Sequence, residues 1–242
     1  MSRASISDIG VQMPPHEVRK RVKIVVVDDD EDSFPTAGLQ ADGYTVEPWT
    51  RIDSQRLRRL ESGDFDIIVL DIQGIAEPSL SDTGDGLGIL RRIKQVNPDQ
   101  IVVAFSGQTF DLAAVPFWKS TDDAIRKPVT LIQCKEVLDR LIADRISVRA
   151  YWSNLSRILD ASGVAAGRKR NLERHIVGAA KAGRQISLEN VRDIVGTIDG
   201  IDTVIAWARK IIAICSLALY PRRLRRSRRT PALVQRVGSS TG

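Results

Sequence analysis

Three apolar runs constrain the first half of the chain more than any other feature. They are VKIVVV at 22–27, FDIIVL at 65–70 and IVVAF at 101–105. Near-continuous apolar runs of this length are typical of parallel strands that are buried on both faces. Further strands are expected at 44–49 and 123–126, and helical patterns stand between the strands at 32–44, 54–60 and 86–96. This alternation predicts an α/β fold, a doubly wound five-stranded parallel sheet.

Polar residues follow the predicted strands at their carboxyl ends, where such sheets bind ligands. The first strand ends in Asp28 and Asp29, the third in Asp71, the fourth in Ser106 and the fifth in Lys127. Three carboxylates, a hydroxyl and an ammonium at one edge fit phosphoryl transfer. Carboxylates hold Mg²⁺ or attack phosphorus, and the other two groups bind phosphoryl oxygens.

Five consecutive acidic residues, 28–32, follow the first strand. Carboxylates this close repel one another, and burial would force some of them to take up protons unless a cation shares the site. We therefore expect a metal ion, with Mg²⁺ the best candidate because it prefers hard oxygen ligands.

Four motifs, VVVDDDE, IIVLDI, AFSG and IRKP, give the chain a specific resemblance. With them, residues 22 to about 145 resemble the receiver domain of two-component response regulators. The resemblance implies a flavodoxin-like sheet of five parallel strands with five helices. It also implies phosphorelay signal transduction, in which the chain is a phosphoprotein served by a histidine kinase or a phosphotransfer protein.

The resemblance assigns roles to individual residues. Asp71 would be the phosphoacceptor, and Asp28 and Asp29 would bind Mg²⁺ together with Asp71 and the main-chain carbonyl of Gln73. Ser106 and the Lys of a cis Lys-Pro pair would bind the phosphoryl oxygens.

The Lys and Pro of that pair are Lys127 and Pro128, and two nearby features depart from the family pattern. The segment 73–85 is longer than the usual turn and reads as a surface loop by composition. Ala124 stands where the family usually has an aromatic residue, so the coupling between hydroxyl and aromatic ring is expected to differ.

A second enzyme class uses similar chemistry. Haloacid-dehalogenase-type phosphatases place a nucleophilic Asp after a parallel strand and an acid/base Asp two residues later, a spacing that Asp28 and Asp30 satisfy. Asp32 stands where that pattern prefers Thr, which makes this Mg²⁺-dependent phosphatase the alternative interpretation.

The second half of the chain is basic and helical in pattern. Residues 1–128 hold 15 Lys and Arg against 21 Asp and Glu, whereas residues 129–242 hold 21 against 9. We expect a tail at 1–21, a receiver domain at 22–145, an all-α region at 146–220 and a disordered basic tail at 221–242. Apolar residues from 131 to 159 recur at alternating steps of three and four, which predicts a long helix running past residue 149 that could also form a homodimer.

Charge limits what the last helix and the tail can do. The stretch 201–220 carries Arg209 and Lys210 at its centre, so it is expected to be a core or interface helix and not a membrane span. Six arginines fall within 222–229. This tail could bind nucleic acid nonspecifically or contact an anionic membrane surface.

The two cysteines, Cys134 and Cys215, lie far apart in apolar stretches, and residues 1–10 show no secretory pattern. We therefore expect a cytoplasmic protein. The expected function is that of a response regulator, a signal relay and not an enzyme.

Overall fold

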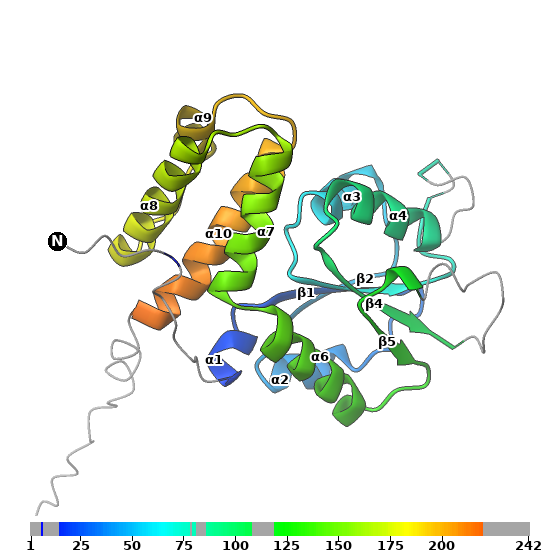
Figure 1. Cartoon of the computed structure of the whole chain (residues 1–242). Coiled ribbons are helices and arrows are strands. Elements are labelled where there is room, and N and C mark those ends of the chain that lie inside the picture. Colours follow the sequence, from blue (N-terminus) through cyan, green and yellow to red (C-terminus); the bar gives the residue numbers. More distant parts are fainter. Residues whose placement is uncertain (1–5, 7–14, 78, 81–85, 108–118, 220–242) are drawn as a thin grey trace, which may run out of the picture.

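The computed structural model describes residues 6, 15–77, 79–80, 86–107 and 119–219 (Figure 1). The predicted basic tail at 221–242, and most of the predicted tail at 1–21, lie outside these residues. The described part of the predicted tail at 1–21 includes a short helix, α1 (Pro15–Arg19), whose Val18 is buried.

One sheet of five parallel strands confirms the predicted fold class. Its strands lie in the order β2-β1-β3-β4-β5, and every pair in the order is parallel. This is the doubly wound order of flavodoxin-like folds. The strands are β1 (Lys23–Val27), β2 (Thr45–Trp49), β3 (Ile67–Asp71), β4 (Ile101–Ser106) and β5 (Asp123–Arg126).

Helices cover both faces of the sheet (Figure 1). Successive strand residues point to opposite faces, so Val25 packs into one apolar cluster and Val26 into the other. The first cluster includes buried residues of α3 (Ser54–Glu61) and α4 (Gly86–Val96). The second includes residues of α2 (Thr36–Ala41) and α6 (Leu131–Arg145).

The predicted long helix is wrong in one respect, because the chain breaks it in two. Helix α6 ends at Arg145, Ile146 is extended, and the Ser147 side chain accepts a hydrogen bond from the Ala150 N–H to begin α7 (Val148–Ala161). A serine N-cap of this kind satisfies a backbone donor that has no partner inside the helix. Six of the apolar residues that repeat at steps of three and four are buried within this chain, whereas Leu131 and Trp152 are partly exposed. The buried residues are Cys134, Leu138, Leu141, Val148, Leu155 and Leu159.

The helical part comprises α7, α8 (Ala166–Ala182), α9 (Leu188–Val195) and α10 (Ile201–Leu219), as the sequence predicts in outline. Helix α10 packs along both α7 and α8. Buried residues of this part, such as Leu155 and Ile211, belong to the same contiguous apolar cluster as Ile24 of β1. The predicted division of the chain at residue 146 stays a prediction.

A buried polar joint ties α7 and α10 to the amino end of β3. The Tyr151 hydroxyl donates to Asp66 Oδ1 at 2.8 Å, and Lys210 Nζ lies 3.4 Å from the same oxygen. Lys210 Nζ also donates to the Phe65 carbonyl at 2.7 Å. The Lys23 N–H donates to Asp66 Oδ2 at 2.7 Å, which explains why β3 begins after Asp66 and not at residue 65 as predicted.

Among the described helices, none is both long and apolar enough to cross a membrane. Helix α10 is a core and interface helix, as its central charges predict.

Candidate phosphoryl-transfer site

The carboxyl ends of the strands bring the predicted site residues to one edge of the sheet. Asp71 is the last residue of β3 and Ser106 the last of β4, while Asp28 and Lys127 directly follow β1 and β5. Because the strands are parallel, all four lie at the same edge.

Lys127 bridges the two buried carboxylates. Its Nζ lies 2.6 Å from Asp28 Oδ2 and 2.9 Å from Asp71 Oδ2. Asp71 Oδ1 accepts from the Ile72 N–H at 2.6 Å, and Ser33 Oγ donates to Asp28 Oδ2 at 2.5 Å. Charge-assisted contacts of this kind fix the carboxylate planes.

Burial and pairing act in opposite directions on these groups. Burial raises the pKa of Asp71 above its usual value, and the hydrogen bonds from Lys127 and from the Ile72 N–H reduce the shift without cancelling it. Burial by itself would lower the pKa of Lys127, but its hydrogen bonds to Asp28 and Asp71 outweigh that effect and the pKa is raised. The ammonium is thus held in its charged form beside the carboxylates.

The three carboxylates fit a divalent cation. One oxygen from each of Asp28, Asp29 and Asp71 lies within 4.8 Å of the others. Asp29 is exposed, whereas Asp28 and Asp71 are 4% and 7% exposed, so the cluster opens to solvent on one side only. Carboxylate oxygens are the ligands that Mg²⁺ prefers.

The chain beyond Asp71 approaches this cluster closely. Gly74 has a positive φ of 71°, and a Cβ there would lie 2.5 Å from Asp29 Oδ2, so only glycine fits without a shift. Gln73, whose carbonyl is the fourth expected ligand, is exposed. Its role stays a prediction.

Lys127 contacts the last two residues of β4, Ser106 through the backbone and Phe105 through its ring. The Lys127 N–H donates to the Ser106 carbonyl at 3.0 Å, Ser106 is 3% exposed, and the Lys127-Pro128 peptide is cis. Lys127 Nζ lies 4.7 Å from the centre of the Phe105 ring, a cation–π contact. Neither Phe105 nor Ser33 is marked in the sequence as part of the site, because both reach it through tertiary packing.

The segment after Asp71 is more firmly packed than its composition predicts. Ile72, Ile75 and Ala76 are buried, and the Ile52 N–H donates to the Ile75 carbonyl at 2.6 Å. The prediction of a surface loop at 73–85 is therefore wrong for Ile75 and Ala76, whereas Gln73 and Gly74 are exposed. Residues 78 and 81–85 of the loop lie outside the described part of the chain.

Ala124 lies in β5 and is exposed, three residues before Lys127. Its methyl group cannot supply a ring that turns inward. The expected difference from the family pattern at this position follows from the residue itself.

Asp28 has more partners than Asp71. Asp28 Oδ1 accepts from the Asp30 N–H at 3.0 Å, and its Oδ2 is shared by Ser33 and Lys127. Among the described residues, the two oxygens of Asp71 have one partner each, the Ile72 N–H and Lys127. Asp30 uses its own Oδ1 to accept from the Asp32 N–H at 3.1 Å, as in a turn. The alternative phosphatase pair would need both carboxyl groups free to face a substrate.

No family model matches the chain, and no curated protein matches it either. Among solved structures, it is similar to the receiver domain of NtrX from Brucella abortus, at 28% identity over 50% of this chain and 98% of that chain, with a TM-score of 0.41. It is also similar to a two-component response regulator from Clostridium difficile, at 22% identity over 52% of this chain and 99% of that chain, with a TM-score of 0.42. A longer NtrX chain from Brucella abortus is matched at 24% identity over 66% of this chain and 35% of that chain, with a TM-score of 0.43.

The strand order, the acidic cluster and the cis Lys-Pro pair together define the class of protein fold to which the sheet belongs. The sheet-bearing part of the chain has the fold of a response-regulator receiver domain, as its four motifs indicate. The helical part that follows it is an additional structure packed on that fold.

Proposed function

We propose that the chain is a response regulator that accepts a phosphoryl group on Asp71 from a histidine kinase or a phosphotransfer protein. The observation that carries this proposal is the bridge from Lys127 to both Asp28 and Asp71 beside a solvent-facing Asp29. This arrangement places a nucleophile, a cation and metal ligands within one cluster.

In the proposed reaction, an oxygen of Asp71 forms a bond to phosphorus while the bond from phosphorus to the donor's histidine nitrogen breaks. The electron pair of the broken bond stays on that nitrogen. The Ile72 N–H holds the other oxygen of Asp71, and Lys127 turns its ammonium from the carboxylates to the arriving phosphoryl oxygens. Asp28, Asp29, Asp71 and the Gln73 carbonyl would hold Mg²⁺, which when bound would supply further positive charge to these oxygens.

The product is an acyl phosphate at a strand end, which changes the charge of that end and biases the surface around β4 and β5. The chain then acts as a relay in the cytoplasm and not as an enzyme. Its helical part is the output region, and the Arg-rich segment at 222–229 adds nonspecific contact with nucleic acid or with an anionic membrane surface. Pairing of two copies is a further proposal.

Incubation with Mg²⁺ and a small phosphodonor, followed by intact-mass measurement, tests the acceptor. We expect a labile gain of one phosphoryl group that Asp71→Asn abolishes. Asp30→Asn is the matched control, because Asp30 is exposed and lies in the same acidic run, and it should still be modified.

Two further variants, Asp71→Ala and Asp28→Ala, together with Asp30→Asn separate the relay from the phosphatase. Turnover of phosphate esters that survives Asp71→Ala but is lost in Asp28→Ala and Asp30→Asn would contradict the relay and favour the phosphatase. Unchanged phosphorylation of Asp71→Asn would also contradict it.

A further inference from the structure

A cavity lies at the opposite edge of the sheet from Asp71, between the receiver fold and the helical part. Its volume is about 730 Å³, within the range of sites for small molecules. One wall comes from α3 and from the segments that precede β1 and β3, and the other comes mainly from α10.

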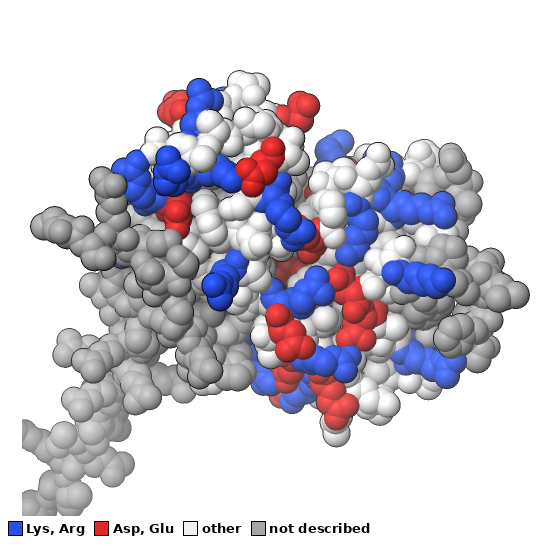
Figure 2. Space-filling model, in the orientation of Figure 1, with Lys and Arg blue, Asp and Glu red and all other residues white. Residues whose placement is uncertain are grey.

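The lining of this cavity has an excess of positive charge. Six Lys and Arg residues line it against three carboxylates. The cations are Arg21, Lys23, Arg58, Arg59, Arg209 and Lys210, and the carboxylates are Asp64, Asp66 and Asp202. Lys and Arg side chains also recur, interspersed with carboxylates, over the face of the molecule in Figure 2.

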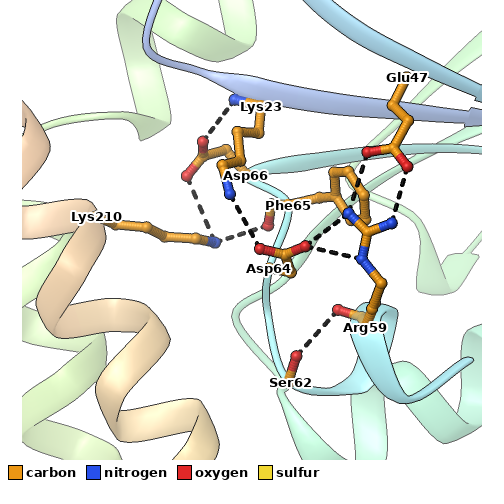
Figure 3. A network of polar contacts seen from close by, with 8 residues as sticks. All are labelled: Lys23, Glu47, Arg59, Ser62, Asp64, Phe65, Asp66 and Lys210. Carbon is orange, nitrogen blue, oxygen red and sulfur yellow. Dashed lines mark hydrogen bonds and ion pairs between the residues drawn. The ribbon is translucent and has the colours of Figure 1, made fainter. Parts of the chain in front are cut away.

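Half of these cations are already neutralised (Figure 3). Lys23 Nζ lies 3.0 Å from Asp64 Oδ1, and Arg59 lies 2.8 Å from Asp64 Oδ2 and 2.8 Å from Glu47. Lys210 is held by Asp66 and the Phe65 carbonyl. The two carboxylates at the base of the cavity are thus fully used by their neighbours.

The other three cations, Arg21, Arg58 and Arg209, are exposed. Within the described residues no carboxylate pairs with any of their guanidinium groups, and Asp202 is the one lining carboxylate that also lacks an ion pair. The unpaired arginines come from both sides of the cavity, Arg58 from α3 and Arg209 from α10. Guanidinium groups bind phosphate through paired hydrogen bonds.

The wall formed by α10 and α7 adds an apolar surface. Tyr151, Ile205 and Ile214 line the cavity and are buried, with Ala206 and Ala213 beside them. A ligand that used the whole cavity would present anionic groups to the arginines and an apolar or planar body to this wall.

We propose that this cavity binds a nucleoside phosphate, whose phosphates contact Arg58 and Arg209 and whose base lies on the apolar wall of α10. Such a ligand contacts the receiver fold and the helical part at once. It therefore stabilises their packing against each other, because it binds the folded chain and not the unfolded one. The inference does not rest on phosphorylation of Asp71.

Calorimetric titration of the full-length chain tests the cavity, in a buffer without divalent metal so that the acidic cluster takes no part. The probes are adenosine triphosphate, tripolyphosphate and adenosine. We expect adenosine triphosphate to bind more tightly than either of the other two. Arg58→Ala and Arg209→Ala should each weaken its binding about fivefold or more, since each removes a charge-assisted contact.

Arg91→Ala is the matched control, because Arg91 is an exposed helical arginine of α4 that does not line the cavity. It changes the net charge equally and should leave the affinity unchanged. Circular dichroism checks that all three variants fold.

Three results would overturn the inference. One is no measurable binding of adenosine triphosphate. Another is equal affinity in the unchanged chain and in both cavity variants, which would assign the binding to the Arg-rich segment at 222–229. The third is tripolyphosphate binding as tightly as adenosine triphosphate, which would leave the apolar wall without a role.

Discussion

Gly86, the first residue of α4, lies where no side chain fits. A Cβ at this position would lie 2.1 Å from the Asp71 carbonyl oxygen, and the Gly86 N–H donates to the Ile72 carbonyl at 2.6 Å. The start of α4 therefore lies directly on the backbone that carries the proposed acceptor. Only a residue without a Cβ permits this approach.

Gly86→Ala should lower the free energy of unfolding by about 2 kcal/mol or more, because backbone atoms must move apart. Gly178→Ala is the contrasting variant: Gly178 lies inside α8, and a Cβ there would meet nothing within 4 Å. It should raise the free energy of unfolding by about 0.5 to 1 kcal/mol. Denaturant unfolding of both variants checks the pair, and equal changes would contradict it.

Lys127 links metal binding to stability. Lys127→Ala leaves Asp28 and Asp71 buried without their shared cation, so the free energy of unfolding should fall by about 2 to 4 kcal/mol without metal. Mg²⁺ should then stabilise this variant more than the unchanged chain, because the ion replaces the missing charge. Thermal melting with and without Mg²⁺ measures this.

Asp29→Asn serves as the control for the metal, since Asp29 is exposed and, within the described part of the chain, forms no ion pair with Lys127. It should reduce the stabilisation by Mg²⁺ in either background. A stabilisation that is the same in all four chains would show that the ion binds elsewhere.

At the scale of single residues, the sequence predicts the convergence of Asp28, Asp71 and Lys127 because parallel strands share one edge. It does not predict the contact of Phe105 with Lys127, or the close approach of Gly74 to Asp29. Both depend on how loops and rings pack in three dimensions, and neither leaves a periodic pattern in the chain.

At the scale of the elements, α10 places one polar side chain, that of Lys210, in the joint with the sheet. The side chain of Lys210 is 9% exposed, and burial lowers its pKa, while Asp66 partly opposes that shift. The ring of Trp207 lies beneath the ammonium, with its centre 4.7 Å away. The joint between α10 and the sheet thus contains a charge that is costly to leave without its partner.

Lys210→Ala should lower the free energy of unfolding by about 3 kcal/mol, because Asp66 remains buried with only the Tyr151 hydroxyl and the Lys23 N–H as donors. Lys20→Ala changes a residue that is exposed and should alter stability by less than about 0.5 kcal/mol. Urea unfolding compares the two, and an equally small effect of both would contradict the importance of the joint.

The elements themselves are largely predictable. The sequence gives the bounds of α4 and β5 and the order of strands and helices, because glycines and apolar periods mark them. It misses the break between α6 and α7, since the apolar steps of three and four continue across Ile146 and Ser147. Here a serine cap and a single extended residue decide the outcome, and the apolar pattern records neither.

At the scale of the whole molecule, burial makes several groups of the described residues hold their protons in the folded state. Burial raises the pKa of Tyr44 and of Tyr151 above 10.0, that of Cys134 to about 12 and that of Cys215 to about 11. Lys210 acts in the opposite direction, because its lowered pKa lets the unfolded chain bind more protons.

The raised pKa values decide how stability depends on pH. The folded chain keeps protons that the unfolded chain releases from about pH 9 upward, so the stability from these groups is complete below pH 9 and falls as pH rises above it. The part from Cys215 is lost as pH passes about 11, and the parts from the other three groups are lost at higher pH. We expect tyrosinate absorbance of Tyr44 and Tyr151 to appear together with the loss of the far-ultraviolet helical signal. Ionisation of both in a chain that is still folded would contradict this; Tyr151→Phe and Tyr44→Phe assign the two signals.

The length of β3 sets the distance between the proposed acceptor and the polar joint that holds α10. Asp71 ends this strand and Asp66 directly precedes it, so four buried residues lie between the proposed acceptor and the residue that anchors α10, a separation of about 17 Å of extended chain. A single buried strand therefore connects Asp71 to Asp66 through the interior of the sheet. A change at Asp71 is thus only one strand length away from the contacts that Asp66 makes with α7 and α10.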